Sequence, residues 1–199
     1  MSHDPAVRRA TAADADRITT ILALAFVNDP VWGPVIARPD GGTRHHAALW
    51  RPFVDGALRF PATWLTAGGE AAAIWIPPGA TSMTPEQEGH LAELAARHLG
   101  PGAGRYLELT EVIHAAHPRQ EPHYFLTLLG THPDHRGHGL GMRLLARSLE
   151  PIDAEHQPAY LESSNPANDR KYAGLGFEPF GEIACPDGLI ISTMWRPAR

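Results

Sequence analysis

The sequence contains a single cysteine, Cys185, and lacks any hydrophobic run long enough to cross a membrane. One cysteine cannot form a disulfide within the chain. The longest apolar run near the start, residues 21–26, is far shorter than the ~20 residues that a transmembrane helix needs. Residues 1–15 carry acids and arginines where a secretory signal peptide has an apolar stretch. We therefore expect a cytoplasmic protein that does not associate with membranes.

Basic clusters are also scarce. The 199 residues include 17 Lys and Arg against 22 Asp and Glu, and no basic run is long enough to follow a phosphate backbone. We therefore expect no nucleic-acid partner and favour a small-molecule one. His132, His135 and His138 have a spacing that a metal site would use, with Asp134 between them. Because the chain has 12 histidines, such a cluster is expected by chance, and we predict no metal.

Hydrophobic periodicity predicts both strands and helices. With 199 residues and 43% hydrophobic content, the chain is expected to form one domain, residues 1–199. The patterns predict an α/β (α+β) domain with a mixed, twisted sheet of about seven strands flanked by helices. The predicted strands cover residues 6–10, 63–67, 71–76, 123–131, 159–164, 177–183 and 189–195.

The most informative segment is the glycine-rich loop that follows strand 123–131 and precedes a helix. It reads Arg136-Gly137-His138-Gly139-Leu140-Gly141. Glycines let backbone N–H groups close around an anion, the helix N-terminus adds a favourable dipole, and Arg136 adds a charged donor. The loop therefore suits a pyrophosphate, although an ordinary tight turn is an alternative.

Two other phosphate-binding classes fit this loop less well. A P-loop requires a lysine after its last glycine, but Met142 follows Gly141. The dinucleotide fingerprint would begin at Gly137 and would need a small residue at position 142. Glu162 stands about 20 residues further on, where that fingerprint has its ribose-binding acid, but too few residues follow the loop to complete a doubly wound sheet.

The pattern Arg136-x-x-Gly139-x-Gly141 resembles the acyl-CoA-binding motif of the GNAT acetyltransferase superfamily. The family continues with a strand that ends in Asn and then a Tyr-x-x-x-Gly-Phe run, and this chain has Asn165 followed by residues 172–177, Tyr-Ala-Gly-Leu-Gly-Phe. The resemblance follows the element order of the whole chain and is sharpest over residues 123–180. Segments 7–11, 25–30, 121–126 and 160–164 look like the puromycin N-acetyltransferase-like subgroup. The implied GNAT fold has two central parallel strands that splay to admit acyl-CoA.

The resemblance also implies roles for individual residues. The strand end would bind the pantetheine arm and stabilise the oxyanion, the loop would bind the pyrophosphate, and two asparagines would support the cofactor arm. Tyr172 would be the general acid that protonates the leaving thiolate, although an ordinary core tyrosine is the alternative. The implied residues that bind acetyl-CoA are Leu129, Gly130, Thr131, Arg136, Gly137, His138, Gly139, Leu140, Gly141, Asn165 and Asn168.

The amine must lose a proton before it attacks, and the candidates for the base are Glu121, His123 and Glu162. Glu162 shares a strand face with Tyr160 and Ser164 by the two-residue period of a strand. It is equally compatible with a structural, salt-bridged acid. Glu121 and His123 stand at the start of a strand, where they would bind a cationic substrate as readily as deprotonate it.

The acceptor side is predicted from Phe26, Asp29, Trp32 and His123. Asp29 would pair with the substrate amine or cap the end of the first helix, and Trp32 would belong to the core or to the pocket wall. The expected reaction is direct transfer of acetyl from acetyl-CoA to a primary amine of a small molecule, by a monomer or a homodimer. The alternatives are acetylation of a peptide or protein amine, and a non-catalytic acyl-CoA sensor.

Overall fold

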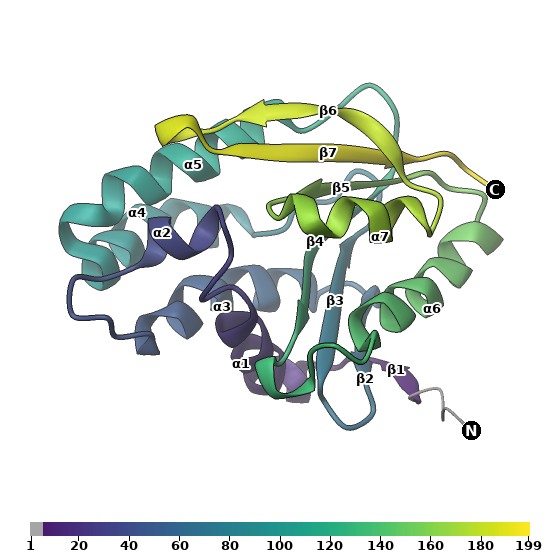
Figure 1. The fold of residues 1–199 in the computed structure, drawn as a ribbon, viewed down its shortest axis with the longest axis horizontal. Helices are drawn as coiled ribbons and strands as arrows, with labels where there is room; N and C mark the ends of the chain where they lie inside the picture. Colours follow the sequence, from purple (N-terminus) through teal and green to yellow (C-terminus); the bar gives the residue numbers. More distant parts are fainter. Residues whose placement is uncertain (1–5) are drawn as a thin grey trace.

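The computed structural model describes residues 6–199, so the first five residues of the predicted domain lie outside it. Seven strands form one sheet in the order β1-β2-β3-β4-β5-β7-β6 (Figure 1). β4 and β5 run parallel, and the other neighbouring pairs are antiparallel. This confirms the predicted mixed sheet flanked by helices. The strands are β1 (Val7–Arg9), β2 (Thr63–Thr66), β3 (Ala71–Ile76), β4 (Tyr124–Thr131), β5 (Ala159–Ser163), β6 (Glu178–Ala184) and β7 (Ile190–Arg196).

The helices cover both faces of this sheet (Figure 1). None of those between residues 6 and 199 combines the length and the apolar content that spanning a bilayer requires. α3 continues through Pro52, where the sequence would favour a kink or a break. The helices are α1 (Ala15–Ala25), α2 (Trp32–Ile36), α3 (Arg44–Ala57), α4 (Pro85–Leu99), α5 (Ala103–Ala116), α6 (Leu140–Ala154) and α7 (Asp169–Ala173).

β3 is buried on both faces and separates two hydrophobic clusters. Ala72, Ile74 and Ile76 share a cluster with the apolar residues of α1 and α3, whereas Ala71 and Trp75 share one with the leucines of α6. The alternation follows from the two-residue period of a strand. The indole Nε1 of Trp75 also donates a hydrogen bond to the Ser148 hydroxyl of α6, at 2.9 Å.

β4 contains an irregularity that changes which face its side chains meet. Ile74 pairs with Leu128 and Trp75 with Leu126, so Thr127 is an extra residue. Leu126 packs in the α6 cluster and Leu128 in the α1 and α3 cluster, although a regular strand would place both on one face. The bulge thus changes the face of the sheet on which the side chains in the second half of β4 lie.

The parallel pairing of β4 with β5 is short. It joins Tyr124, Phe125 and Leu126 to residues 159–161 and does not extend to the last residues of either strand. Beyond it, the edge of β4 that faces β5 has backbone groups without a strand partner. This divergence creates the opening in which the candidate site lies.

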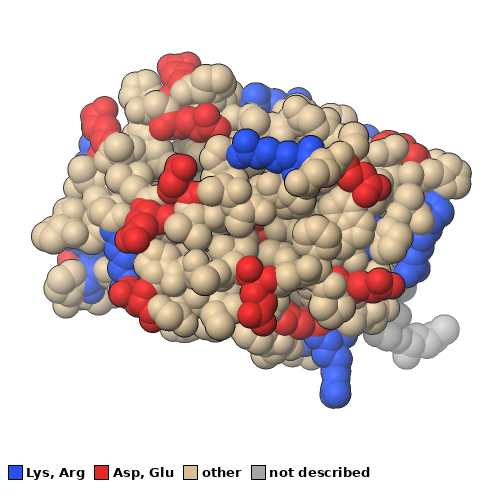
Figure 2. Space-filling model, turned by 90° about the horizontal axis from the view of Figure 1, so that it is seen from above, with Lys and Arg blue, Asp and Glu red and all other residues tan. Residues whose placement is uncertain are grey.

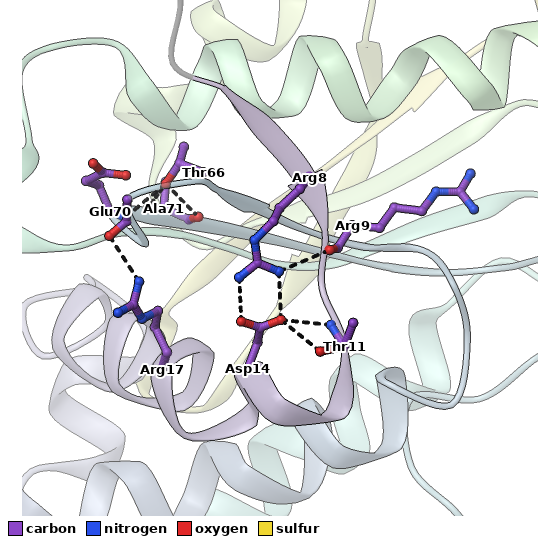
Figure 3. A network of polar contacts seen from close by, with 9 residues as sticks. Arg8, Arg9, Thr11, Asp14, Arg17, Thr66, Glu70 and Ala71 are labelled. Carbon is purple, nitrogen blue, oxygen red and sulfur yellow. Dashed lines mark hydrogen bonds and ion pairs between the residues drawn. The ribbon is translucent and has the colours of Figure 1, made fainter.

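A polar network fixes the start of α1 against β1 (Figure 3). The Arg8 guanidinium donates two hydrogen bonds to the Asp14 carboxylate, at 2.8 and 2.6 Å. The same carboxylate accepts from the Thr11 backbone N–H at 2.9 Å, so Thr11 and Asp14 form a capping box. Arg17 of α1 donates to the Gly68 carbonyl in the turn between β2 and β3. The Arg8 contact and the Thr11 hydrogen bond hold the pKa of Asp14 well below its usual range.

We expect Asp14→Ala to lower the free energy of unfolding by about 1 kcal/mol at pH 7, which is typical of losing a helix cap. Because the native pKa of Asp14 is depressed, its contribution is complete above the ordinary aspartate pKa and is lost as the pH falls. The free energies of unfolding of Asp14→Ala and of the unsubstituted protein, measured by urea unfolding, should therefore converge below about pH 3. Glu93→Ala is a control, since it removes only an exposed ion pair on α4 and should cost less than about 0.5 kcal/mol. A constant difference from pH 7 to pH 2 would contradict the assignment.

Candidate active site

A cavity of about 1890 Å³ opens where β4 and β5 diverge. The glycine loop, the end of β4 and α7 form part of its lining, and residues of α1, α4 and α5 complete it. Sites for a single small ligand typically measure roughly 300–1,000 Å³. The cavity therefore has room for two reactants.

The glycine loop supplies the features expected of an anion site. Gly137 and Gly139 have φ values of +83° and +70°, in the left-handed region that favours glycine. Gly139 immediately precedes α6 and has no side chain to cap it, and the first N–H groups of a helix have no partner within the helix. Both glycines line the cavity together with Leu140, whereas His138 is exposed and is outside the cavity lining. The loop therefore presents backbone donors to the cavity. The side chain of His138, which is predicted to bind acetyl-CoA, lies outside the cavity lining.

Two close contacts hold the loop against the sheet and α1. A Cβ atom on Gly141 would lie 2.7 Å from the Thr131 hydroxyl, so only glycine lets α6 begin this close to the end of β4. Arg136 donates from Nη2 to the Ala25 carbonyl at the end of α1, at 2.7 Å. The guanidinium is thereby held at the loop, where it adds positive charge.

The end of β4 lines the cavity through Leu129, Gly130 and Thr131. A Cβ on Gly130 would approach side-chain atoms of Leu22 and Ala25 to 3.0 Å. Glycine at this position therefore serves the packing of α1 against the sheet, while the backbone of the strand end borders the cavity. The structure brings all three predicted residues to one wall.

Tyr172 projects from α7 into the same region. Its side chain is buried at 8% exposure, its ring packs edge-on against Phe177, and it lines the cavity. Burial raises the pKa of Tyr172, and the negative charges of Asp169 and Asp29 raise it further. The phenol is therefore protonated at neutral pH, as a general acid must be.

The two predicted asparagines line the cavity beside Tyr172 and also shape the turn before α7. Asn165 Oδ1 accepts from the Ala167 backbone N–H at 3.1 Å, and Asn168 Oδ1 accepts from Lys171 Nζ at 3.0 Å. The first contact caps a single 3-10 turn, residues 166–168. Both amides are thus fixed at the cavity wall.

Glu162 of β5 is the buried acid of the site. Its side chain is 10% exposed, and its Oε1 atom lies 3.6 Å from Nδ1 of His117. Burial raises the pKa of Glu162, and this effect is opposed by His117 and by the nearby Tyr160 hydroxyl. No pattern in the sequence indicates the contact of His117 with Glu162, because His117 follows α5 and reaches Glu162 only through the fold.

His123 and Glu121 play different structural parts. His123 is buried, its Nδ1 lies 2.7 Å from the Glu121 backbone carbonyl, and its Nε2 lies 3.2 Å from Nε2 of His117. Burial lowers the pKa of His123. The side chain of Glu121 is exposed at the cavity wall. The predicted base candidates thus form a cluster at one wall, with Glu162 the most buried carboxylate.

The predicted acceptor residues Phe26, Asp29 and Trp32 also line the cavity. Phe26 and Trp32 pack against Trp50, with ring centroids 4.9 and 5.1 Å apart. Asp29 accepts from the backbone N–H groups of Val31 and Trp32 through Oδ1, so it caps the start of α2 rather than the end of α1. Hydrophobic periodicity does not predict α2, because the helix has only five residues.

The second oxygen of Asp29, Oδ2, accepts from the Ser164 hydroxyl at 2.6 Å. This contact crosses the cavity entrance from the loop after α1 to the end of β5. Asp29 therefore has structural partners for both oxygens while bordering the cavity.

The remaining lining is acidic and apolar. Among the described residues, the cavity is bordered by more carboxylates than cations, and two of the cations, Arg136 and Lys171, lie at the loop and α7 end. Figure 2 shows the molecule from above. On this face, acidic side chains are spread over the half above α4 and α5, with basic ones between them. Within residues 6–199, no group of three or more His, Cys, Asp or Glu is arranged to hold a metal ion. The lining carboxylates are Asp29, Glu88, Glu108, Glu111, Glu121 and Glu162.

Comparisons with known proteins agree with this architecture. Residues 85–177 match the model of the acetyltransferase (GNAT) family. A Corynebacterium glutamicum structure described as histone acetyltransferase HPA2 and related acetyltransferase is 28% identical, with a TM-score of 0.70 over 98% of this chain and 97% of that one. Drosophila melanogaster polyamine N-acetyltransferase is 18% identical, with a TM-score of 0.65 over 96% and 99%. Mosquito arylalkylamine N-acetyltransferase like 5b is 18% identical, with a TM-score of 0.60 over 96% and 99%.

The sheet that opens between β4 and β5 and the glycine loop give this chain the GNAT fold, and residues 85–177 match the family model. The protein is an acetyl-CoA-dependent N-acetyltransferase, and acetyl-CoA is its co-substrate. The residues present fit that molecule, since the uncapped N-terminus of α6 and Arg136 suit a diphosphate. The unpaired edge of β4 beyond Leu126 suits an extended chain that carries amide groups.

We expect Gly139→Asp to weaken acetyl-CoA binding at least about tenfold, because a carboxylate would stand where the diphosphate binds. Gly188→Asp is the matched control: Gly188 has a similar φ of +72° and lies in the turn between β6 and β7, outside the cavity lining. Both variants carry the same backbone strain and added charge. Isothermal titration with acetyl-CoA should separate them, and equal affinity in the two variants would refute the loop assignment.

Proposed function

We propose that this enzyme transfers the acetyl group of acetyl-CoA directly to a primary amine of a small molecule. The observation that supports this most is the arrangement of the cavity. It joins an anion-binding loop to a protonated phenol, Tyr172, and a buried carboxylate, Glu162. These are the parts that an acyl transfer to an amine needs: a binding site for each reactant, a base and an acid.

Acetyl-CoA supplies the activated acetyl thioester. In our proposal, backbone N–H groups of the Gly137–Gly141 segment and the Arg136 guanidinium hold its diphosphate, while Asn165 and Asn168 support the adjoining arm. The unpaired backbone at Leu129–Thr131 would hold the pantetheine arm and stabilise the negative charge that develops on the acetyl oxygen. Such positioned donors contribute several kcal/mol in acyl transfer.

Glu162 takes a proton from the incoming ammonium group, which frees the nitrogen lone pair for attack. Tyr172 donates its proton to the departing sulfur and recovers one from the nitrogen as the amide forms. Burial supports both assignments, because it raises the pKa of Glu162 towards neutrality and keeps Tyr172 protonated. His123 and Glu121 are assigned to the surroundings of the base rather than to the base itself.

The acceptor end favours a cationic amine that also carries an apolar group. Phe26, Trp32 and Trp50 supply an aromatic wall, and carboxylates of α4 and α5 border the cavity beyond it. Aromatic faces and carboxylates both attract ammonium groups. The puromycin N-acetyltransferase-like subgroup stays a prediction, and an antibiotic-like amine is one member of the class we propose.

A panel of amines tests this proposal. Thiol release from acetyl-CoA should be measured with puromycin, agmatine, spermidine, tyramine, an aminoglycoside and a short lysine-containing peptide, after thermal shift has established acetyl-CoA binding. We expect turnover with at least one small amine and little with the peptide. Peptide turnover alone would favour a peptide or protein acceptor, and binding without turnover on any amine would favour a sensor.

We expect Tyr172→Phe to lower kcat about 100-fold, which is typical of losing a general acid. KM for acetyl-CoA should stay within about twofold, since the phenol acts on the sulfur after binding. Tyr124→Phe is the matched control, because the Tyr124 hydroxyl bonds to Glu155 on the far side of β4 from the cavity. If Tyr172→Phe retained full turnover, Tyr172 would not be the acid.

A further inference from the structure

Four groups at one wall of the cavity form a continuous chain of contacts. The Glu121 backbone carbonyl lies 2.7 Å from Nδ1 of His123, and Nε2 of His123 lies 3.2 Å from Nε2 of His117. Nδ1 of His117 in turn lies 3.6 Å from Oε1 of Glu162. The two imidazoles, from the segments before and after Pro118, thus connect a fixed carbonyl to the buried carboxylate.

The Glu121 carbonyl determines which ring nitrogens of His123 and His117 carry hydrogens. A carbonyl oxygen only accepts, so Nδ1 of His123 carries a hydrogen and donates. Since burial favours the neutral form of His123, its Nε2 atom has no hydrogen and accepts. Nε2 of His117 must therefore carry a hydrogen and donate it to His123. This leaves Nδ1 of His117, which faces Glu162, as the position that is free to gain a proton.

We propose that His117 is the proton acceptor that regenerates Glu162 after each amine deprotonation, and that His123 is a positioning residue that locks His117 in the tautomer this needs. The inference rests on the proposed role of Glu162 as the base. Neither histidine is required to touch the amine. These roles explain why two imidazoles lie in a row beside a buried carboxylate.

The proton balance follows from these positions. Glu162 begins as a carboxylate and His117 as the neutral Nε2–H tautomer. The ammonium N–H bond breaks and an O–H bond forms on Glu162. That proton then passes to Nδ1 of His117, which becomes an imidazolium, and leaves for water because the His117 side chain is 26% exposed. Each cycle therefore releases the one proton that converting an ammonium group to an amide requires.

The surroundings of the pair contain few other titratable groups. Tyr160 on β5 contacts both imidazole rings, and His114 of α5 and Cys185 after β6 lie within electrostatic range of Glu162. Phe125 and Trp195 complete the aromatic packing around the histidines. In its protonated form His117 lowers the pKa of Glu162 against the effect of burial, so replacing His117 should raise that pKa.

The tautomers can be tested without any substrate. Long-range proton–nitrogen correlation on protein labelled with nitrogen-15 in histidine should show His123 protonated at Nδ1 and neutral His117 protonated at Nε2, with signals assigned by His117→Gln and His123→Gln. Glu162→Gln should shift the His117 Nδ1 resonance and leave the His123 tautomer unchanged. Finding neutral His117 protonated at Nδ1 would overturn the proposal, whether or not the protein acetylates amines.

The kinetic test uses His117→Gln, whose amide still donates a hydrogen bond to His123 but does not accept a proton. With the best amine of the panel, we expect kcat at pH 7 to fall about tenfold and the acid limb of the pH profile to move to higher pH. KM for acetyl-CoA should stay within twofold. His90→Gln is the matched control, since His90 is exposed on α4 and lies outside the cavity lining.

The remaining outcomes separate the two proposals. A loss in His117→Gln that is equal at all pH values, or confined to KM, would mean a structural role and would overturn the relay. Added imidazole should restore part of the activity of His117→Ala, because the deleted ring leaves space beside Glu162. If Glu162→Gln retained full activity while the tautomers were as expected, the assignment of the base would fail rather than the geometry of the histidines.

Discussion

The short parallel pairing of β4 with β5 is the constraint on which the rest of the structure depends. The strands are joined over residues 124–126 and 159–161 only, and their separation leaves the backbone of β4 free to bind another extended chain. Unpaired backbone groups in a protein interior are costly unless something satisfies them. The fold tolerates this edge because it borders a cavity, and the same cavity collects the glycine loop, Tyr172 and Glu162. In the proposed mode of binding, the opening of the sheet is therefore also the place where acetyl-CoA binds.

Several local devices keep the two strands apart. The bulge at Thr127 turns the second half of β4, so that Leu128 and Gly130 serve the cluster under α1. Gly130 permits α1 to pack against that half, and Gly141 permits α6 to begin beside its end. Asp29 then bridges the gap by capping α2 with one oxygen and binding Ser164 of the opposite strand end with the other. Each of these features is weak alone, but together they hold open the cavity between β4 and β5.

The sequence was informative wherever function depends on neighbouring residues. Short segments with a characteristic spacing contain the glycine loop, the asparagines and Tyr172. The two-residue alternation in β5 indicated Glu162 as a candidate. It predicted the seven-stranded sheet for the same reason, since each strand shows its own periodicity. It could not predict α2, whose five residues carry too little pattern, or the contact of His117 with Glu162, which joins α5 to β5 across the fold. His138 belongs to the motif but is exposed and lies outside the cavity lining, and its role in binding acetyl-CoA stays a prediction.

In the proposed mechanism, the position of Glu162 is a compromise between two physical demands on a base. A carboxylate in water is too weak a base to deprotonate an ammonium group efficiently, and burial strengthens it by raising its pKa. Burial without a partner would raise the pKa so far that the acid would stay protonated at neutral pH. His117 limits this rise while remaining partly exposed to water, and His123 fixes its orientation from the apolar side. The rings of Phe125, Tyr160 and Trp195 pack around the two imidazoles and so hold them in place near Glu162.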